Sequence, residues 1–564
     1  MELGRLTPTS RNFHLSNTPY LTLSLLYHPH AAAFHASASS TTPLPQLLLL
    51  IRVASAPGKV LITGGYLILE KPNPGIVVST TARFYAIVKP LYEDIKAESW
   101  SWVWTDVKLT SPQLSRVAEY KLSLKTLSLQ ITSSRDNANP FVEQAVQFSV
   151  AAAKALCTDD AKKDMIRRLL LQGLDITIVG SNDFYSYRNQ IVAHGLPLTS
   201  EALSSLQPFS SITFNMENSN GVGSGDESKP EVAKTGLGSS AAMTTAVVAT
   251  LLHYLGAINI SSSTRGINEE DTIDAHLNLV HAVAQTAHCM AQGKVGSGFD
   301  VSAAVFGSQY YVRFSPEVLS PAQVMLKGSS LQDVMSDILK GKWDHERVQC
   351  SLPPLMTLVL GEPGTGGSST PSMVGAVKRW QQSDPNKSLK IWSGLSEANS
   401  KLEILLNKLR RFAEEQWETY KMVLRGCSRH VSEKWREQMA DPCRCMIVEA
   451  LLGARAAMIE IRSFMQQMGK AAGVPIEPES QTQLLDTTMS LEGVLLAGVP
   501  GAGGFDAIFA VTLGESSKDC LTKVWSSLGV LPMLVTEDPR GVSLESGDPR
   551  NMEISSRINS LSLV

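Results

Sequence analysis

The segment from Lys234 to Met243, Lys-Thr-Gly-Leu-Gly-Ser-Ser-Ala-Ala-Met, leads directly into the apolar, helix-compatible stretch from Thr244 to Leu255. Its glycines allow the backbone to turn tightly and to approach an anion, and the first turn of the following helix offers N–H groups that lack intrahelical partners. The neighbouring serines add hydroxyl groups. The segment therefore predicts a phosphate-binding loop at a helix N-terminus. A small-residue turn that merely begins an ordinary helix is the alternative, because Gly and Ser are also good N-cap residues.

The charge balance limits what the chain binds. It has 564 residues with 43% hydrophobic content, enough for large cores and more than one domain. Its formal net charge is only −3, so there is no overall basic field for nucleic acid or an anionic membrane. No apolar run reaches the ~18 residues of a membrane span. We expect no nucleic-acid partner and no membrane span, and we expect local basic groups to meet any anionic substrate.

Residues 1–51 differ in composition from the rest. Ser, Thr, His and Pro are frequent, and Glu2 is the only acidic residue before Glu70. The pattern fits a disordered extension or an organelle targeting segment. The seven cysteines are scattered, which suits a reducing compartment, and Cys443 and Cys445 lack a second Cys/His pair for a metal site. We expect a cytoplasmic protein, with a peroxisomal or plastid location as the alternative if residues 1–51 are a true targeting segment.

Hydrophobic periodicity predicts a domain change near 345–355, and helices followed by strands suggest an α+β second domain. We expect folded domains at 52–350 and 351–540 in an α+β protein, followed by a flexible tail at 541–564. The first domain opens with a strand, a turn at Pro57-Gly58 and a second strand. Residues 215–231 are rich in Gly, Ser and Asn and are expected to form a mobile loop or lid. Further strands are expected at 76–78, 84–88, 100–104, 124–131, 173–180, 310–314, 355–360 and 507–512, and helices at 139–156, 244–255, 272–292 and 401–467, the last with a break near Asp441-Pro442.

Glycine-rich elements recur along the chain at 57–59, 234–243, 296–300 and 500–506. Two of them carry a charged residue suited to phosphoryl transfer: Lys59 to neutralise the transferring oxygens and Asp300 to orient or deprotonate the acceptor. The sequence has neither a Gly-x-x-x-x-Gly-Lys-Ser/Thr loop nor the His-Arg-Asp and Asp-Phe-Gly pair of protein kinases. The residues alone therefore predict a small-molecule kinase outside the two commonest nucleotide-binding architectures.

The order and spacing of these elements resemble the three motifs of the GHMP kinases over roughly residues 52–515. The matching motifs are Pro57-Gly58-Lys59, Gly236 to Ala242 and Gly501 to Gly504. Together with Gly64-Gly65-Tyr66-Leu67, Asn182 to Ser186 and Gly296 to Asp300, they are most similar to the eukaryotic phosphomevalonate kinases.

The resemblance implies an N-terminal domain of ribosomal-protein-S5 type and a ferredoxin-like C-terminal domain, with ATP and the acceptor between them. It implies ATP- and Mg²⁺-dependent transfer to 5-phosphomevalonate, giving 5-diphosphomevalonate in isoprenoid biosynthesis, by a monomer or homodimer. Another GHMP kinase, such as mevalonate kinase, is the nearest alternative. A catalytically inactive nucleotide sensor of the same fold is another alternative, against which the presence of both Lys59 and Asp300 argues.

Family roles carry over by position. Lys59 matches the active-site lysine, Asp300 matches the acceptor-side aspartate, and the hydroxyl of Ser239 or Ser240 matches a Mg²⁺ ligand. The expected ATP-binding residues are Lys234, Thr235, Gly236, Leu237, Gly238, Ser239, Ser240 and Ala241. The expected acceptor-binding residues are Tyr66, Ser186, Arg188, His288, Gln292, Lys294, Ser297 and Gly503.

The sequence also departs from the family pattern, and some assignments have plain alternatives. Residues 232–235 replace the Pro-x-Gly that often precedes the glycine-rich loop, and Gly65 replaces a glutamate. Arg188 and Lys294 equally suit solvated surface cations. His281 and His288 are seven residues apart and so share a helix face, where packing is the alternative to ligand binding.

A phosphate acceptor changes what the site must do. The second pKa of a phosphate monoester is about 6, so its attacking oxygen is already largely ionised near neutral pH. The main difficulty is then to bring two polyanions together, which favours screening by Lys59, Mg²⁺ and further cations over proton abstraction. We therefore expect Asp300 to orient Lys59 or the acceptor rather than to act as a strong base.

Overall fold

The computed structural model describes residues 51–95, 103–212, 214–215, 231–232, 234–260, 270–324, 330–364 and 370–551. The predicted lid at 215–231 lies almost wholly outside these residues, as do residues 1–50 and 552–564. The described residues from 51 onward belong to one compact unit. None of the described helices is long and apolar enough to cross a membrane.

A nine-stranded sheet forms the first half of this unit, in the order β10-β9-β2-β6-β3-β4-β5, with β1 paired to β2 and to β15. Neighbouring strands are antiparallel except for β3 and β6, which are parallel. The strands are β1 (Arg52–Thr63), β2 (Gly75–Pro90), β3 (Trp104–Ser111), β4 (Arg116–Ser123), β5 (Leu129–Ile131), β6 (Leu174–Gly180), β9 (Gln309–Val312), β10 (Glu346–Gln349) and β15 (Ser543–Leu544).

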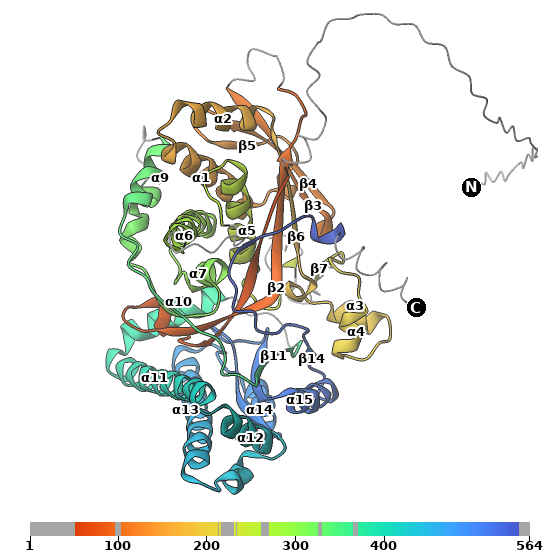
Figure 1. The fold of residues 1–564 in the computed structure, drawn as a ribbon, viewed down its shortest axis with the longest axis vertical. Coiled ribbons are helices and arrows are strands. Elements are labelled where there is room, and N and C mark those ends of the chain that lie inside the picture. Colours follow the sequence, from red (N-terminus) through yellow and green to blue (C-terminus); the bar gives the residue numbers. More distant parts are fainter. Residues whose placement is uncertain are drawn as a thin grey trace, which may run out of the picture. The chain divides into compact units, whose positions relative to one another are not determined.

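Helices cover one face of this sheet. Figure 1 shows the sheet nearly edge-on, with α1, α5, α6, α7 and α9 together on one side of β2. Helix α5 packs directly on β1 and β2, and most of its residues are buried, as expected for a helix that is apolar all round. All the helices of this half are α1 (Pro140–Leu156), α2 (Asp160–Leu171), α3 (Arg188–Ala193), α4 (Ser200–Ser204), α5 (Ser239–Tyr254), α6 (Glu270–Gln292), α7 (Phe299–Phe306), α8 (Ser320–Gln323) and α9 (Leu331–Lys340), of which α3 and α4 lie on the other side of β2 in Figure 1.

The predicted turn at Pro57-Gly58 between two strands is wrong, because the structure has a single strand, β1, there. The chain runs through Pro57-Gly58 as one strand, with a register shift between Pro57 and Lys59 where it pairs with β2. A Cβ atom on Gly58 would lie 2.9 Å from Phe184 Cε1 and 3.1 Å from the Leu237 carbonyl oxygen. Glycine is thus required by the close approach of another segment and marks an irregularity in the strand, which is a common role of glycine in strands.

The second half contains an antiparallel sheet in the order β12-β13-β11-β14, and the paired helices α11 and α13. The predicted break near Asp441-Pro442 is confirmed: Asp441 caps α13 by accepting a hydrogen bond from the Arg444 N–H. The elements are α10 (Thr370–Ser383), α11 (Pro385–Glu415), α12 (Trp417–Cys427), α13 (Pro442–Ala472), α14 (Glu479–Met489) and α15 (Glu515–Ser527), with β11 (Met356–Glu362), β12 (Val494–Gly498), β13 (Ile508–Leu513) and β14 (Leu531–Pro532). The α+β class is confirmed, and the boundary at 350/351 stays a prediction that falls between β10 and β11.

After β14 the chain returns to the first sheet. The Asp538 carbonyl accepts a hydrogen bond of 2.6 Å from Ser79 Oγ, and residues 543–544 pair with β1. The buried guanidinium of Arg83 donates to the Gly541 carbonyl at 2.7 Å and to Ser55 Oγ at 2.7 Å. The described part of the predicted tail, 541–551, therefore begins as an edge strand of the large sheet, because Arg83 and Ser55 supply buried polar partners for it.

Two histidines pack together, the buried His281 on α6 and the half-buried His345 just before β10. The rings of His281 on α6 and His345 lie 4.6 Å apart, and Trp343 and Phe306 contact His281. Neither His281 Nε2 nor His345 Nδ1 has a hydrogen-bond partner among the described residues. Burial and the nearby Arg347 lower the pKa of His345 to about 4, against a small opposing effect of Asp344, and burial beside His345 and Arg347 lowers the pKa of His281 well below its usual value.

We predict that this pair destabilises the fold in acid. Between pH 6.5 and 4, His345 is protonated in the unfolded chain but stays neutral in the folded protein. The free energy of unfolding therefore falls as the pH falls through this window. At ~1.4 kcal/mol per pKa unit the loss is on the order of 3 kcal/mol for His345. Urea unfolding across this range should show the loss, and His345→Gln should flatten it, whereas the same change at the exposed His194 should not. Equal pH dependence in wild type and His345→Gln would contradict the prediction.

Candidate active site

The loop at 234–240 has the geometry of an anion-binding site. Gly236 and Gly238 adopt left-handed conformations with φ of 76° and 75°, and Gly238 is the N-cap residue of α5. Because glycine has no side chain, no side-chain oxygen caps the first turn of this sixteen-residue helix, which begins at Ser239. The free N–H groups at the start of the helix and the adjacent serine hydroxyls are therefore available to phosphate oxygens.

Neighbouring segments hold this loop by backbone contacts. Lys234 pairs with Tyr185, and the Thr235 hydroxyl donates to the Asp183 carbonyl at 2.5 Å. The Lys59 N–H donates to the Leu237 carbonyl at 2.9 Å. Thr235 and Leu237 are buried, so the structure places these two expected ATP ligands as anchors of the loop.

Lys59 lies against the loop. Its Nζ donates to the Gly236 carbonyl at 3.0 Å and lies 5.4 Å from the centre of the Phe299 ring. A Cβ atom on Gly238 would lie 2.9 Å from Lys59 Cε, so glycine there also makes room for the lysine. Burial lowers the pKa of Lys59, and the nearby Asp300 carboxylate partly opposes this. The register shift in β1 thus places the Lys59 ammonium group next to the predicted phosphate-binding loop.

Asp300 reaches the same place from a different helix. It lies in the first turn of α7, after the left-handed Gly298, and its Oδ1 accepts a hydrogen bond of 3.0 Å from the Val301 N–H. The other carboxylate oxygen, Oδ2, lies 3.9 Å from His288 Nε2. Lys59 and Asp300, 241 positions apart in the sequence, are therefore neighbours, as their predicted roles require.

His288 and Gln292 on α6 complete the polar cluster. His288 Nε2 lies 3.0 Å from Ser240 Oγ and 3.4 Å from Gln292 Nε2. Burial lowers the pKa of His288, Asp300 opposes this, and Lys294 adds to it. The sequence placed His288 with the acceptor, whereas its hydrogen-bond partner in the structure is a serine of the predicted nucleotide loop.

Several of the residues expected to bind the acceptor form hydrogen bonds or close contacts with other parts of the protein. The Tyr66 hydroxyl donates to the Ala502 carbonyl at 2.9 Å, and Gly503 has φ of 77° with no room for a Cβ beside Ile476. The carbonyl of the buried Ser297 accepts from the Tyr311 hydroxyl at 2.9 Å. Lys294 is exposed at the end of α6. Tyr66 and Gly503 thus join the 64–66 turn to the 501–504 loop.

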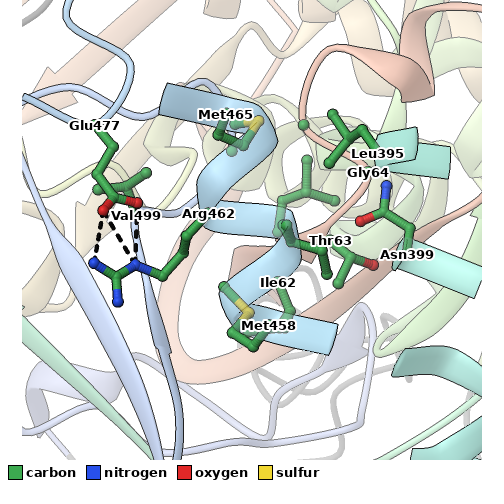
Figure 2. A pocket seen from close by; sticks show the side chains of 14 residues that line it. Ile62, Thr63, Gly64, Leu395, Asn399, Met458, Arg462, Met465, Glu477 and Val499 are labelled. Carbon is green, nitrogen blue, oxygen red and sulfur yellow. Dashed lines mark hydrogen bonds and ion pairs between the residues drawn. The ribbon is translucent and has the colours of Figure 1, made fainter. Parts of the chain in front are cut away.

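A small cavity lies behind the 64–66 turn. In Figure 2, Thr63 lies between Met458 and Arg462 of α13 and Asn399 of α11, and the Arg462–Glu477 ion pair is among the lining residues. That pair is buried and joined by an N–O distance of 2.7 Å. The cavity holds about 20 Å³, room for roughly one water molecule. The cavity is too small for a nucleotide. It is a packing gap between the 64–66 turn and helices α11 and α13.

Ser186 and Arg188 face the second sheet. Ser186 Oγ donates to Glu362 Oε1 at 2.5 Å, and Arg188 Nη1 donates to the Glu362 carbonyl at 3.3 Å. Burial raises the pKa of Glu362, Ser186 and Arg188 oppose this, and Asp506 adds to it. Sequence reasoning missed Glu362. Its place just after the predicted strand at 355–360 was the only available signal.

The donor groups fit a magnesium nucleotide complex. No group of three or more His, Cys, Asp or Glu side chains among the described residues is arranged to hold a metal by itself, including Cys443 and Cys445. Mg²⁺ usually takes one or two protein oxygens and completes its shell with substrate phosphates and water. The hydroxyls of Ser239 and Ser240 suit that role, and the Asp300 carboxylate lies 3.9 Å from the His288 nitrogen that Ser240 contacts.

Comparisons with known proteins agree with this site. No protein-family model matches the chain. The chain is 63% identical over 511 residues to the peroxisomal phosphomevalonate kinase of Arabidopsis thaliana, covering 91% of this chain and 99% of the relative. It is 30% identical over 514 residues to phosphomevalonate kinase erg8 of Aspergillus fumigatus, covering 86% and 90%.

The fold is also shared with a solved structure. The Lin0012 protein of Listeria innocua superimposes with a TM-score of 0.55 at 16% identity, covering 88% of this chain and all of that chain. Identity this low speaks for the fold alone. The identity to the plant relative extends over nearly the whole of both sequences, and on that ground the chain belongs to the phosphomevalonate kinases, within the GHMP kinase superfamily that its glycine-rich motifs resemble.

Proposed function

We propose that the chain transfers the γ-phosphoryl group of ATP to the phosphate of 5-phosphomevalonate, giving 5-diphosphomevalonate and ADP. The observation that carries the proposal is the convergence of Lys59 Nζ and Asp300 on the uncapped start of α5, in a chain of this family. Phosphoryl transfer needs positioning and charge neutralisation more than covalent chemistry. The site supplies both.

Each residue has a defined task in this reaction. The N–H groups at the start of α5 bind the triphosphate, and the serine hydroxyls there bind phosphate oxygen or its Mg²⁺. Mg²⁺, when bound with the nucleotide, neutralises charge on the β- and γ-phosphates. Lys59 Nζ exchanges its hydrogen bond to the Gly236 carbonyl for one to a transferring oxygen. Asp300 orients Lys59 and the acceptor, whose phosphate is already ionised near neutral pH.

The acceptor phosphate requires further cations. Arg188 is held by the Glu362 carbonyl, and Lys294 follows the end of α6, so we assign both to acceptor binding. Tyr66 and Gly503 shape the acceptor side through the 501–504 loop. The name of the Arabidopsis relative supports the peroxisomal alternative for this chain over the cytoplasm. The expected oligomeric state, monomer or homodimer, stays a prediction.

Acceptor choice separates the proposal from its rivals. With ATP and Mg²⁺ we expect ADP release with 5-phosphomevalonate, and little or none with mevalonate or homoserine at equal concentration. A coupled ADP assay on the three acceptors measures this directly. Turnover with mevalonate instead would indicate another GHMP kinase, and tight ATP binding without turnover on any acceptor would indicate a nucleotide sensor.

Lys59 and Asp300 should differ in importance. Lys59→Met removes the cation from the transferring oxygens and should lower the single-turnover rate by about 10²- to 10³-fold, the usual scale of a lost electrostatic contact. Asp300→Asn keeps the shape and should cost only about 10-fold, because no proton must be removed. Rapid-quench measurements at saturating ATP compare the two variants. An Asp300→Asn loss equal to or larger than that of Lys59→Met would refute the orienting role and indicate general-base catalysis.

Arg188 tests the acceptor assignment. Losing a charge-assisted contact to phosphate costs roughly 1.5–3 kcal/mol, so Arg188→Met should raise the acceptor KM by about 10- to 100-fold. Arg188→Lys keeps the charge and should recover part of the loss. The ATP KM should stay near the wild-type value in both variants. An unchanged acceptor KM in Arg188→Met would remove Arg188 from the site.

A further inference from the structure

His288 connects the two sides of the candidate site. Its Nε2 lies 3.0 Å from Ser240 Oγ at the start of α5 and 3.9 Å from Asp300 Oδ2 at the start of α7. The residue is only 2% exposed, and the ring of Phe141 lies 5.3 Å from its own ring. A buried polar ring placed in this way fixes the direction of the hydrogen bonds around it.

The neighbouring groups determine which way the hydrogen bond runs. Gln292 presents its amide nitrogen to the same Nε2 at 3.4 Å, and that nitrogen is a donor only. An Nε2 that faces a donor acts as the acceptor, which places the ring proton of the neutral histidine on Nδ1. The Asp300 carboxylate oxygen near the same Nε2 lies 3.9 Å away, beyond hydrogen-bond distance, and does not require a proton on that nitrogen. The Ser240 hydroxyl must then donate its proton to His288.

A serine whose proton is already used presents only oxygen lone pairs to its other neighbours. Such an oxygen can offer a lone pair to a metal ion but can no longer donate a hydrogen bond to a phosphate. Ser239, the preceding residue of the helix, makes no hydrogen bond to a histidine among the described residues and keeps its donor for phosphate. The two serines at the start of α5 therefore have different chemistry despite their identical side chains.

We propose that His288 is a positioning residue that holds the proton of Ser240 and so presents the Ser240 oxygen to the Mg²⁺ of the bound nucleotide. The inference rests on the nucleotide site of the proposed function and adds to it the residue that selects Ser240 over Ser239 as the metal ligand. The acceptor takes no part in this step.

Calorimetry of ADP binding with and without Mg²⁺ tests the role without any turnover. The measured quantity is the ratio of the two dissociation constants, which reports how strongly metal and nucleotide support each other. His288→Phe should reduce this ratio by about 5-fold, the scale of one lost neutral hydrogen bond. His288→Gln, whose amide oxygen can accept at nearly the same place, should keep the ratio within about 2-fold of wild type.

Ser240→Ala should reduce the ratio at least as much as His288→Phe, and the double variant should lose no more than Ser240→Ala alone, because both changes remove one interaction. Phe141→Leu is the matched control: it alters packing against His288 without touching its hydrogen bonds and should leave the ratio unchanged. Equal weakening of ADP binding with and without Mg²⁺, or additive losses in the double variant, would overturn the proposal.

A spectroscopic measurement on the wild-type protein tests the same claim, with His288→Gln used only to assign the resonances. In ¹⁵N-histidine spectra, the resonances that disappear in His288→Gln should show the proton on Nδ1 and a bare Nε2. A proton on Nε2 would overturn the proposal. If the protein failed to act on 5-phosphomevalonate while the Mg²⁺-dependent ADP ratio behaved as expected, the proposed acceptor would be wrong and the role of His288 would stand.

Discussion

The close approach of strand β1 to the loop at 234–240 sets the position of Lys59 relative to the start of α5, on which the rest of the site depends. At the register shift between Pro57 and Lys59, the Lys59 N–H donates to the Leu237 carbonyl while its side chain reaches the Gly236 carbonyl. The two glycines at the contact, Gly58 and Gly238, leave no space for a Cβ atom. A larger residue at Gly58 would press on the Leu237 carbonyl of the loop, and one at Gly238 would displace the Lys59 side chain.

The rest of the fold brings further groups to this contact from distant parts of the chain. Helix α5 packs on β1 and β2, α7 presents Asp300, and α6 presents His288, all on one face of the large sheet (Figure 1). The segment after β14 is held by Arg83 and closes against β1 and the end of α7, where the Val542 N–H donates to the Val305 carbonyl at 3.1 Å. The same C-terminal segment therefore contacts both β1, which carries Lys59, and α7, which carries Asp300.

Much of this could be predicted from the sequence where local signals dominate. The helix predicted at 139–156 corresponds to α1 (Pro140–Leu156), capped by Asn139, and the phosphate loop was predicted from its glycines and serines alone. Pro57-Gly58 was misread because a turn and a strand irregularity use the same residues, and only the distant Phe184 and Leu237 distinguish them. The partner of His288 could not be predicted, since Ser240 is 48 positions away and no local pattern encodes the contact. Glu362 was missed for the same reason.

A crystal structure with Mg²⁺, an unhydrolysable ATP analogue and 5-phosphomevalonate would test the central claim most directly. The account predicts the γ-phosphate at the N–H groups that begin α5, with Lys59 Nζ moved from the Gly236 carbonyl to within about 3 Å of a γ-phosphate oxygen. It also predicts the acceptor phosphate on the Asp300 side of that group. Phosphates bound elsewhere, or a Lys59 side chain that stays on the Gly236 carbonyl with nucleotide present, would contradict the account.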